Sequence, residues 1–478
     1  MSGVAEIQTG ATPLLAAAHV LIAMAAGGHA LLTKRDPRAA WGWISVCWFF
    51  PVAGALIYYL FGVNRIRTRA QQFVGAAALP GLGFGTQPLL PRVSGVSESE
   101  LRELVRIGEA MSGNPLVAGN RVEPLHNGEE AYPAMLKAIA AARKSIVLAS
   151  YIFDGGSAGA SFVEALSAAH ARGVAVRVLV DGVADIIYSP SACALLKARG
   201  VSVARFLPPR LVPPMLHINL RNHRKLLAVD GKVAFTGGMN ISDRHFALRN
   251  RSDTTLDLHF RVTGPVARQL EEAFAEDWSF AASEELVLND ETPAAGDAAC
   301  RVITDGPNSD MARLVMVLLG ALATAHRRVW IMTPYFVPPA ELIGALQSAA
   351  LRGVEVIVIL PERSNQRPAD WAARNWLWQL LQRQVQVHYR PRPFAHTKMF
   401  LVDDYYALVG SANMDERSLR LNFELNLEVY DVALVERLAQ HFESVRANSR
   451  ELRLAELEAR SLPVHLRDAF FWLFSAYL

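Results

Sequence analysis

The chain has 478 residues, of which 51% are hydrophobic, and its formal net charge is only +3 at pH 7. So small a charge on so long a chain gives no electrostatic footprint for nucleic acid as a main partner. The three cysteines, Cys47, Cys193 and Cys300, are far apart in the sequence, and no His/Cys cluster has the spacing of metal ligands. We therefore expect no nucleic-acid partner, no metal and no cofactor.

Residues 1–70 are expected to form a two-helix transmembrane hairpin. The stretches 11–32 and 39–63 contain no Asp, Glu, Lys or Arg, and each is long enough to cross a hydrocarbon core, which takes about 20 helical residues. Aromatic residues open and close the second span, as in an aromatic belt: Trp41, Trp43, Trp48, Tyr58, Tyr59 and Phe61. Buried core helices and a removable signal peptide fit less well, because two apolar spans follow each other and the start lacks Lys and Arg.

The sequence does not decide how this hairpin is oriented. Three basic residues lie between the spans and three follow the second span: Lys34, Arg35 and Arg38, then Arg65, Arg67 and Arg69. Lys and Arg are enriched on the cytoplasmic side of membrane proteins, but here the two candidate sides carry three each, so the count does not distinguish them. The lack of a cysteine framework favours a cytoplasmic catalytic part.

Residues 71–96 are rich in Gly and Pro and show little periodicity, which predicts a linker near the membrane. A helix is expected to begin at Ser97, because Ser97 and Glu100 have the spacing of a capping box. The remaining chain is long enough for two packed domains, which we place at 97–290 and 291–478.

Two apolar segments outside the hairpin are candidates for lipid contact. Residues 206–216 are rich in Pro and Leu, and they would border an entrance for acyl chains or form an ordinary packed loop. Residues 469–478 are too short to span a bilayer, so they would lie in the membrane interface or fill a groove of the core.

The two halves of the globular part repeat the same order of elements. Apolar runs at 145–152 and 328–335 each precede a helical pattern, which is followed by a second apolar run at 174–180 or 354–360. Apolar runs that alternate with helices indicate an α/β sheet covered on both faces. We expect two duplicated α/β/α sandwich domains with pseudo-twofold symmetry and one central site.

Each half then carries one copy of a motif in which His precedes Lys by two positions and Asp follows Lys by five. The copies are His223, Lys225 and Asp230, and His396, Lys398 and Asp403. A chance match is expected on the order of once in ten thousand positions, so two copies are not accidental. His and Lys two positions apart on a strand point to the same side, into one pocket. Both aspartates complete the candidate catalytic set, although their positions at turns favour a structural role.

The residues of the motif suit a bound phosphate. Lys225 and Lys398 would act as point charges for the phosphate oxygens. Asn240 and Asn413 follow the motifs after glycine-containing turns and would donate hydrogen bonds. The histidines can act as nucleophile or as acid and base near neutral pH.

An acidic residue follows each motif in the same order and would orient an imidazole, as carboxylates do in other histidine-based sites. The candidates are Asp257 and Glu424, with Asp253 and Glu428 as rivals. A solvated acid at a strand edge is the alternative for either candidate. The histidines outside the motifs match no such frame and are expected to be structural, among them His217, His245 and His259.

The motifs resemble those of the phospholipase D superfamily, and more closely those of bacterial cardiolipin synthases. The closer resemblance rests on the N-terminal hairpin and on residues 150–154 (Ser-Tyr-Ile-Phe-Asp), 333–338 (Thr-Pro-Tyr-Phe-Val-Pro), 410–418 (Gly-Ser-Ala-Asn-Met-Asp-Glu-Arg-Ser) and 422–424 (Asn-Phe-Glu). It covers nearly the whole chain. The resemblance implies two phospholipase D-like domains preceded by the hairpin.

The resemblance also implies a covalent mechanism. By analogy with the superfamily, His223 would attack a phosphodiester to give a phosphohistidine. His396 would protonate the leaving alcohol and then deprotonate the incoming one, although the near-symmetry of the motifs leaves the order of the two histidines open. In cardiolipin synthases the donor is phosphatidylglycerol, the leaving group glycerol and the acceptor a second phosphatidylglycerol. The expected partners are thus phosphatidylglycerol and other anionic phospholipids in the bacterial inner (cell) membrane, with a multi-pass anchor.

Two positions depart from the family pattern. Gly238 stands where many relatives have Ser, so a hydroxyl near the phosphate would be missing on that side, and Asn365 stands where relatives often have Asp. Neither belongs to the His/Lys/Asn set, so neither argues for an inactive enzyme. Three alternatives are a phospholipase D-type hydrolase giving phosphatidic acid, a phosphodiesterase acting on nucleic acid, and a non-catalytic lipid-binding scaffold. The hairpin and the weak charge argue against the second, and the two complete motifs against the third.

Overall fold

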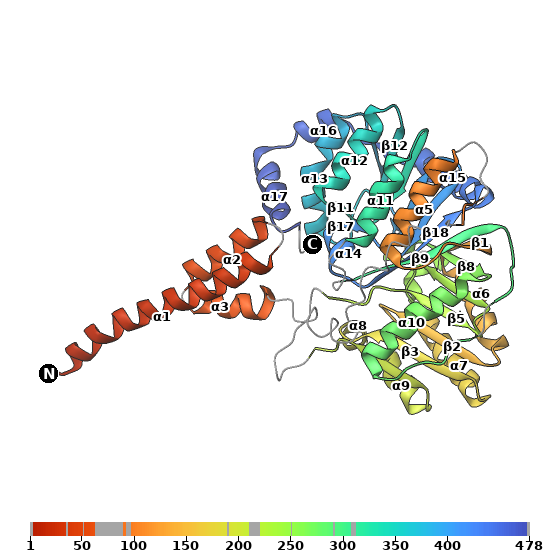
Figure 1. Ribbon diagram of the computed structural model, residues 1–478, viewed down its shortest axis with the longest axis horizontal. Coiled ribbons are helices and arrows are strands. Elements are labelled where there is room, and N and C mark those ends of the chain that lie inside the picture. The colour runs from red at the N-terminus through yellow and green to blue at the C-terminus, as the bar shows by residue number, and fades with distance from the viewer. Residues whose placement is uncertain are drawn as a thin grey trace. The chain divides into compact units, whose positions relative to one another are not determined.

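The computed structural model describes residues 3–34, 37–50, 52–62, 89–91, 97–188, 191–209, 220–249, 251–289, 292–306 and 312–475. The chain forms two compact units, one made of residues 1–75 with 209–216 and the other of the remainder (Figure 1). The expected linker and the candidate acyl-chain entrance lie largely outside the described residues. So do His217 and the basic residues at 65, 67 and 69.

The first unit is helical and consists of α1 (Gly3–Thr33), α2 (Pro37–Phe49), α3 (Ala53–Ile57) and the π-helix η1 (Tyr58–Gly62). Within the described part of the chain, one helix is long and apolar enough to cross a membrane, over Leu15–Thr33. The stretch 39–63 does not form the single helix expected from its hydropathy. Instead α2 ends at Phe49, and Val52 has a positive φ of 59°, which interrupts the helix.

The second unit contains the two predicted halves, and they share one sheet of fifteen strands in the order β19-β13-β12-β10-β15-β16-β18-β9-β1-β8-β6-β5-β2-β3-β4. The first half supplies β1 (Val117–His126), β2 (Ser145–Ser150), β3 (Ala175–Asp181), β4 (Ser202–Phe206), β5 (Leu226–Val229), β6 (Val233–Gly237) and β8 (Leu258–Thr263). The second half supplies β9 (Ala298–Asp305), β10 (Arg328–Met332), β12 (Glu355–Pro361), β13 (Gln386–Arg390), β15 (Met399–Val402), β16 (Tyr406–Gly410), β18 (Glu424–Tyr430) and β19 (Arg450–Glu451).

The strand order expresses the duplication. The central neighbours β1 and β9 are antiparallel, and from them the order β8-β6-β5-β2-β3-β4 in one direction matches β18-β16-β15-β10-β12-β13 in the other. The expected duplicated α/β architecture is thus confirmed, with the two domains joined edge to edge instead of packed as separate sheets. Because equivalent strands lie at equal distances from the centre, both motif strands, β5 and β15, occupy matching positions.

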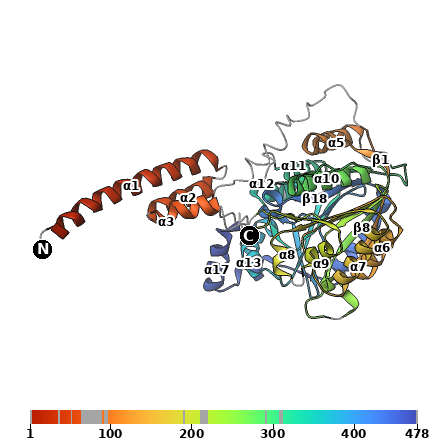
Figure 2. The same cartoon turned by 90° about the horizontal axis from the view of Figure 1, so that it is seen from below.

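Helices cover both faces of this sheet. In the first half they are α5 (Glu98–Ser112), α6 (Asn127–Ala141), α7 (Ser157–Ala171), α8 (Ala184–Ile187), α9 (Ala192–Ala198) and α10 (Val266–Ala282). In the second half they are α11 (Arg313–Ala323), α12 (Ala340–Leu351), α13 (Arg367–Leu381), α14 (Glu416–Arg420), α15 (Val432–Ala447), α16 (Leu454–Glu458) and α17 (Leu462–Trp472). Figure 2 shows α10 and α11 on one side of the sheet and α6 and α7 on the other. Helix α5 begins after Ser97, whose hydroxyl accepts the Glu100 N–H, as predicted.

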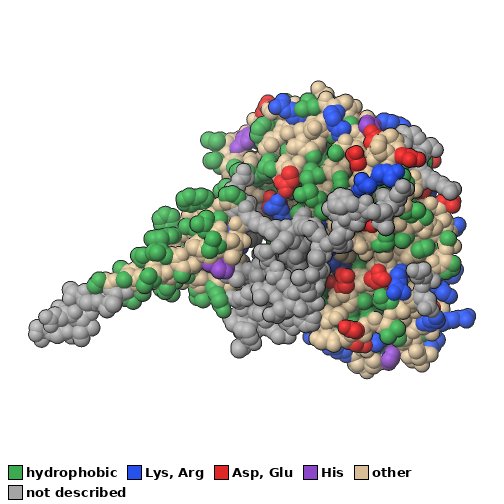
Figure 3. Space-filling model, viewed as in Figure 1, with side chains coloured by type: hydrophobic (Ala, Val, Ile, Leu, Met, Phe, Trp, Pro, Cys, Tyr) green, Lys and Arg blue, Asp and Glu red, His purple; other side chains and the backbone are tan. Residues whose placement is uncertain are grey.

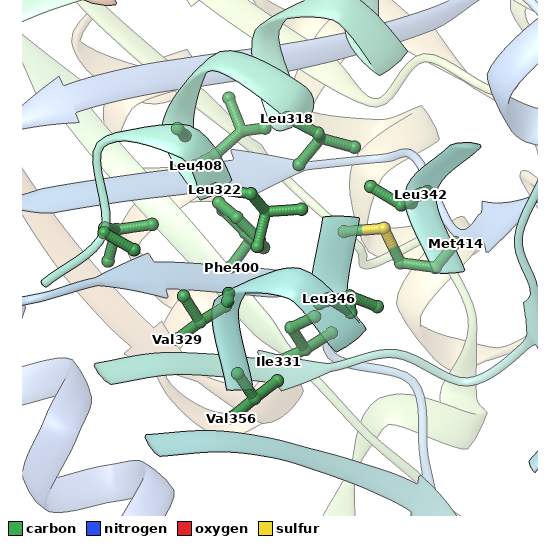
Figure 4. Packing of buried hydrophobic residues seen from close by; sticks show 14 of the residues in the cluster. Leu318, Leu322, Val329, Ile331, Leu342, Leu346, Val356, Phe400, Leu408 and Met414 are labelled. Atoms are coloured by element: carbon green, nitrogen blue, oxygen red, sulfur yellow. The ribbon is translucent and has the colours of Figure 1, made fainter. Parts of the chain in front are cut away.

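The core of the second half illustrates why these segments pair. Side chains two apart on a strand and four apart on a helix face one side. Accordingly Val329 and Ile331 of β10 meet Leu318 and Leu322 of α11 in one buried cluster, shown with its neighbours in Figure 4. Strand β15 is buried at every position, since helices lie on both faces. A motif strand that is buried along its length holds the residues at its start in a fixed position.

The C-terminal aromatic segment packs partly into a groove and partly faces outward. Phe471 contacts Trp371 of α13 with ring centroids 4.8 Å apart, and Trp472 contacts Trp376 at 5.8 Å. Leu462, Leu466 and Phe470 of α17 and Leu473 directly after it are exposed. The groove-filling alternative therefore holds for one face of the helix, and the other face stays available for an interface.

Candidate active site

A short pairing between the halves places the second motif beside an acid of the first half. Strand β14 (Phe394–Ala395) runs parallel to β7 (Thr255–Leu256). The His396 N–H donates to the Leu256 carbonyl at 2.7 Å. The next residue after Leu256 is Asp257, so the histidine and the carboxylate of opposite halves lie side by side.

A symmetric bridge does the same for the first motif. Asn222 pairs in parallel with Phe423, and the His223 N–H donates to the Phe423 carbonyl at 2.9 Å. Glu424 follows Phe423 and reaches the imidazole. Both motifs thus converge because the backbone of each half is bonded to the other immediately before its catalytic candidate.

Each imidazole is held through Nδ1 by the carboxylate of the opposite half. His223 Nδ1 lies 3.1 Å from Glu424 Oε2, and His396 Nδ1 lies 2.8 Å from Asp257 Oδ2. Both carboxylates are buried. They are the two acids that the sequence predicts to orient the imidazoles, but the crossing between halves was not predicted. With Nδ1 engaged, Nε2 is the ring nitrogen left for reaction.

The rival acids are held by arginines elsewhere. Glu428 is fully buried and forms an ion pair with Arg301, with Oε2 2.8 Å from Nε, and it also accepts the Tyr406 hydroxyl. Asp253 lies at the surface and pairs with Arg251 at 2.9 Å. These partners explain the burial of the first acid and the exposure of the second without any role in the site.

Both motif lysines are buried behind their histidines. Lys225 Nζ donates to the His223 carbonyl at 2.6 Å. Lys398 Nζ donates to the His396 carbonyl at 2.5 Å and lies 2.9 Å from His396 Nδ1. Neither lysine is part of the cavity wall, so both lie behind the imidazoles, and their expected contact with phosphate oxygens stays a prediction.

Burial shifts the charged groups of the site towards neutrality. It raises the pKa of Glu424 to about 7 and that of Asp257 to about 6, against the opposing effect of the lysines. It lowers the pKa of Lys225 to about 7 and that of Lys398 to about 8. Burial, and then repulsion from the lysines, lowers the pKa of both motif histidines well below its usual range. The imidazoles are therefore neutral at pH 7 before a phosphate binds.

The two motif histidines line one cavity of about 260 Å³ within the second unit. Its wall includes Asn240 and Asn413, the two residues predicted from the tails of the motifs. Asn240 Oδ1 accepts the Ile152 N–H at 3.1 Å, which leaves its NH₂ group for a ligand. Asn413 donates to the Ser418 hydroxyl at 3.1 Å, so its amide is held by the short helix α14.

Asp230 and Asp403 close turns at the far ends of the motif strands. Their φ angles are 53° and 50°. Each carboxylate accepts hydrogen bonds from three consecutive backbone N–H groups, of residues 143–145 and 326–328 respectively. This geometry ties strand β5 to β2 and β15 to β10. It agrees with the structural interpretation of both aspartates and places them away from the cavity.

The two departures from the family pattern have distinct settings. The Ser411 hydroxyl, which Gly238 lacks, donates to Glu424 at 2.5 Å, so it serves the orienting carboxylate and not a phosphate. A Cβ on Gly238 would lie 2.4 Å from Asp257 Oδ1, so a serine there would have to displace the carboxylate that faces His396. Asn365 lines the cavity and accepts the Tyr335 hydroxyl.

Several cavity residues escaped the sequence reasoning, namely Tyr151, Arg221, Arg417, Tyr335 and His245. Arg221 forms an ion pair with Asp181 at 3.3 Å, and the Tyr151 ring lies 5.1 Å from that of His223. Tyr151, Tyr335 and Arg417 lie in segments that carry the family resemblance. That resemblance is the only feature of the sequence that could have indicated a place for them in the cavity. His245 Nε2 accepts the Asn240 N–H at 3.3 Å, and burial lowers its pKa to about 4. It is therefore a neutral support for Asn240, close to the structural role expected.

Within the described residues, no group of three or more His, Cys, Asp or Glu side chains is arranged to hold a metal ion. The cavity is lined by the two neutral motif imidazoles together with amide and guanidinium groups, among them those of Asn240, Asn413, Arg221 and Arg417. Neutral imidazoles are nucleophiles and bases, and amides and arginines bind phosphate oxygens. This set can carry out phosphoryl transfer through a histidine.

A duplicated α/β sheet that brings two such histidines to one cavity is the architecture of phospholipase D-like enzymes. The model of the family described as "Cardiolipin synthase, PLD-like domain" matches residues 135–278 and 318–446, and one described as "Phospholipase_D-nuclease N-terminal" matches residues 15–62. The chain belongs to the phospholipase D-like cardiolipin synthase family. This confirms the resemblance drawn from the motifs and places the chain among phospholipid-synthesising transferases.

Individual relatives agree over most of the chain. The major cardiolipin synthase of Bacillus subtilis (strain 168) is 29% identical over 93% of this chain and 95% of its own length. Cardiolipin synthase A of Pseudomonas entomophila (strain L48) is 32% identical over 90% of this chain and 91% of its own. Among solved structures, the phosphatidylserine synthase of Haemophilus influenzae Rd KW20 shares the fold, with a TM-score of 0.60, 17% identity and coverage of 79% of this chain and 100% of that one.

Proposed function

We propose that the protein condenses two phosphatidylglycerol molecules to cardiolipin and glycerol. The observation that carries the proposal is the pair of imidazoles in one cavity, each oriented through Nδ1 by a carboxylate of the opposite half. Two such groups supply a nucleophile and an acid/base for a two-step exchange at phosphorus. The family supports the class of reaction, and the cavity provides the groups that the reaction needs.

In the first step, His223 Nε2 attacks the phosphorus of the donor while the phosphorus–oxygen bond to glycerol breaks. His396 gives a proton to the departing glycerol oxygen. In the second step, His396 takes the proton from a hydroxyl of the second phosphatidylglycerol. The oxygen of that hydroxyl bonds to phosphorus, the phosphorus–nitrogen bond breaks, and His223 is neutral again. The assignment of the two histidines follows the superfamily analogy.

The surroundings explain how neutral imidazoles do this work. Arg221 and Arg417 line the cavity with the two asparagines, and together they would hold the phosphodiester oxygens. The negative charge of the phosphate opposes the repulsion that keeps the imidazoles neutral, so His396 can carry a proton once substrate is bound. The buried carboxylates stabilise the imidazolium that forms in each step.

The protein is membrane-associated, and we place it in the bacterial inner (cell) membrane with the catalytic unit on the cytoplasmic side. Helix α1 supplies an apolar segment of sufficient length at Leu15–Thr33. Phosphatidylglycerol is the proposed partner, and other anionic phospholipids share its phosphodiester chemistry. Transfer to a lipid alcohol further requires that water be kept from the phosphohistidine.

The test uses purified full-length protein in mixed micelles with phosphatidylglycerol as the only phospholipid. We expect cardiolipin and glycerol to form in equal amounts. Both products should be lost in His223→Ala and in His396→Ala. His170→Ala, on α7 and outside the cavity wall, is the matched control and should retain activity. Phosphatidic acid in place of cardiolipin would make the protein a hydrolase. If the wild-type protein forms no product while the protein and its variants still bind lipid, the scaffold alternative would be favoured.

A further inference from the structure

The reversal after α2 brings together the two ends of the stretch that hydropathy marks as one span. The ring centroids of Trp43 and Tyr58 lie 5.4 Å apart. In one straight helix these residues would be about 22 Å apart, at 1.5 Å per residue. Lys34, just before α2, donates from Nζ to the carbonyl of Gly62, at the end of η1. The start and the end of the stretch therefore lie at the same level.

Close packing fixes this return. A Cβ on Gly54 would lie 2.1 Å from the Val46 carbonyl oxygen, so α3 can lie against α2 only with glycine at this position. His29 of α1 also hydrogen-bonds the Tyr58 hydroxyl at 2.7 Å. The returning segment is thus attached to both preceding helices.

The tip of the reversal suits hydrocarbon. Phe49, Phe50 and Val52 are 79%, 58% and 59% exposed, and Figure 3 shows apolar side chains spread over the outer surface of this unit. The Phe50 N–H donates to the Val46 carbonyl at 3.2 Å, and the Gly54 N–H to the Phe50 carbonyl at 2.8 Å. Internal bonding of this kind is what backbone groups need where no water is present.

The lengths of the helices fit one crossing and one partial insertion. The 19 apolar residues of α1 span about 28 Å, close to the roughly 30 Å of a hydrocarbon core. The 13 residues of α2 span only about 20 Å before the chain turns back. Helix α2 therefore ends inside the bilayer if it starts at its surface.

We propose that α1 crosses the membrane once and that α2, α3 and η1 form a re-entrant hairpin, which dips into the lipid of one leaflet and returns to the same side. This replaces the second crossing expected from hydropathy. Residues before α1 and residues after Gly62 then lie on opposite sides of the membrane. The partner of the exposed tip is the acyl chains of the leaflet from which the hairpin enters.

The same arrangement decides the orientation that the sequence left open. The basic residues at both ends of the hairpin fall on one side: Lys34, Arg35, Arg38, Arg65, Arg67 and Arg69. Residues 1–33 contain no Lys or Arg. The count of Lys and Arg is then six on one side of the membrane and none on the other. Because such residues are enriched on the cytoplasmic side, the residues that follow Gly62 are placed in the cytoplasm.

Single-cysteine variants of the full-length protein test this topology after replacement of Cys47, Cys193 and Cys300 by Ala. Cysteines are introduced at Ser2, Asp36 and Asn64, and a membrane-impermeant maleimide is applied to spheroplasts and to inside-out vesicles. We expect Asp36→Cys and Asn64→Cys to react only in inside-out vesicles and Ser2→Cys only in spheroplasts. Reaction of Asp36→Cys and Asn64→Cys from opposite faces would establish two complete spans and overturn the proposal.

A cross-linking pair gives a second reading in the same background. Trp43→Cys with Tyr58→Cys should form a disulfide on oxidation in native membranes, detected as loss of a polymer–maleimide gel shift. Trp48→Cys with Tyr58→Cys is closer in sequence but spans the hairpin from tip to base, so it should cross-link less. Preferential cross-linking of the control pair would also overturn the re-entrant arrangement. Both readings are independent of which lipid the enzyme uses.

Discussion

Replacing Asp257 by Asn tests whether each histidine depends on the carboxylate of the opposite half. The change keeps the size of the side chain and an acceptor for the Leu258 N–H, which bonds Oδ1 at 2.9 Å. It removes the charge that faces His396 Nδ1 at 2.8 Å. Although Asp257 belongs to the first half, we expect Asp257→Asn to impair the same step as His396→Ala in the second half. It should not impair the step that His223→Ala impairs.

The expected size of the effect follows from the contact that is lost. A hydrogen bond to a charged group contributes about 1.5–3 kcal/mol, and about 1.4 kcal/mol corresponds to a factor of ten in rate. The value of kcat should therefore fall by about 10- to 150-fold. KM should change little, because Asp257 is not part of the cavity wall. Glu424→Gln should lose a similar factor through His223.

A phosphatidyl donor with a nitrophenol leaving group separates the two failures, because nitrophenolate departs without a proton. If His223 is the nucleophile, this donor restores nitrophenol release by Asp257→Asn and by His396→Ala. It does not restore release by Glu424→Gln or by His223→Ala. If the roles of the histidines are reversed, the donor restores release by the other pair of variants. Asp257→Asn would still behave like His396→Ala, and Glu424→Gln like His223→Ala. The crossed arrangement is refuted if Asp257→Asn groups with His223→Ala.

Three further outcomes follow from the same contacts. Ser411→Ala removes the hydroxyl that donates to Glu424, so kcat should fall about 5- to 10-fold in steady-state kinetics; wild-type kcat would show that the hydroxyl is dispensable. Gly238→Ala puts a Cβ 2.4 Å from Asp257 Oδ1 and should remove most cardiolipin formation, whereas Gly344→Ala, with no atom within 4 Å of the added carbon, should leave activity unchanged. Because the pKa values of Asp257 and Glu424 are raised to about 6 and about 7, both acids take up protons as the pH falls through that range, and the imidazoles lose their anionic partners. Values of kcat should therefore decline from pH 8 to pH 5, and a flat profile would contradict the assignment.

The sequence was sufficient for the cavity residues that lie within the two motifs. His223, His396, Asn240 and Asn413 lie within short motifs whose period-two and turn patterns survive in the fold, so their convergence on one cavity was predictable. The turn positions of Asp230 and Asp403 were predictable for the same reason, because a turn is a local structure, but their inclusion in the candidate catalytic set finds no support in the cavity lining. Residue type and spacing carry this information without any knowledge of the sheet.

What the sequence could not supply depends on contacts across the two halves. Asp257 and His396 are 139 residues apart, and they meet only because β14 pairs with β7. The role of the Ser411 hydroxyl depends instead on a contact within the second half, because its acceptor Glu424 lies on the neighbouring strand β18. Hydropathy similarly measures the apolar length of 39–63 but carries no sign of direction, so the reversal at Val52 was invisible to it.

The central pairing of β1 with β9 makes neither half self-sufficient. A half expressed alone would expose a long open sheet edge and would hold a histidine without its acid and an acid without its histidine. Two identical copies that pair along that edge would cover it and would give each histidine an acid. The side chains around the two histidines would then have to be identical. Joining the copies in one chain allows the two positions to differ, as Gly238 and Ser411 already do, so that one histidine can be tuned for attack and the other for proton transfer.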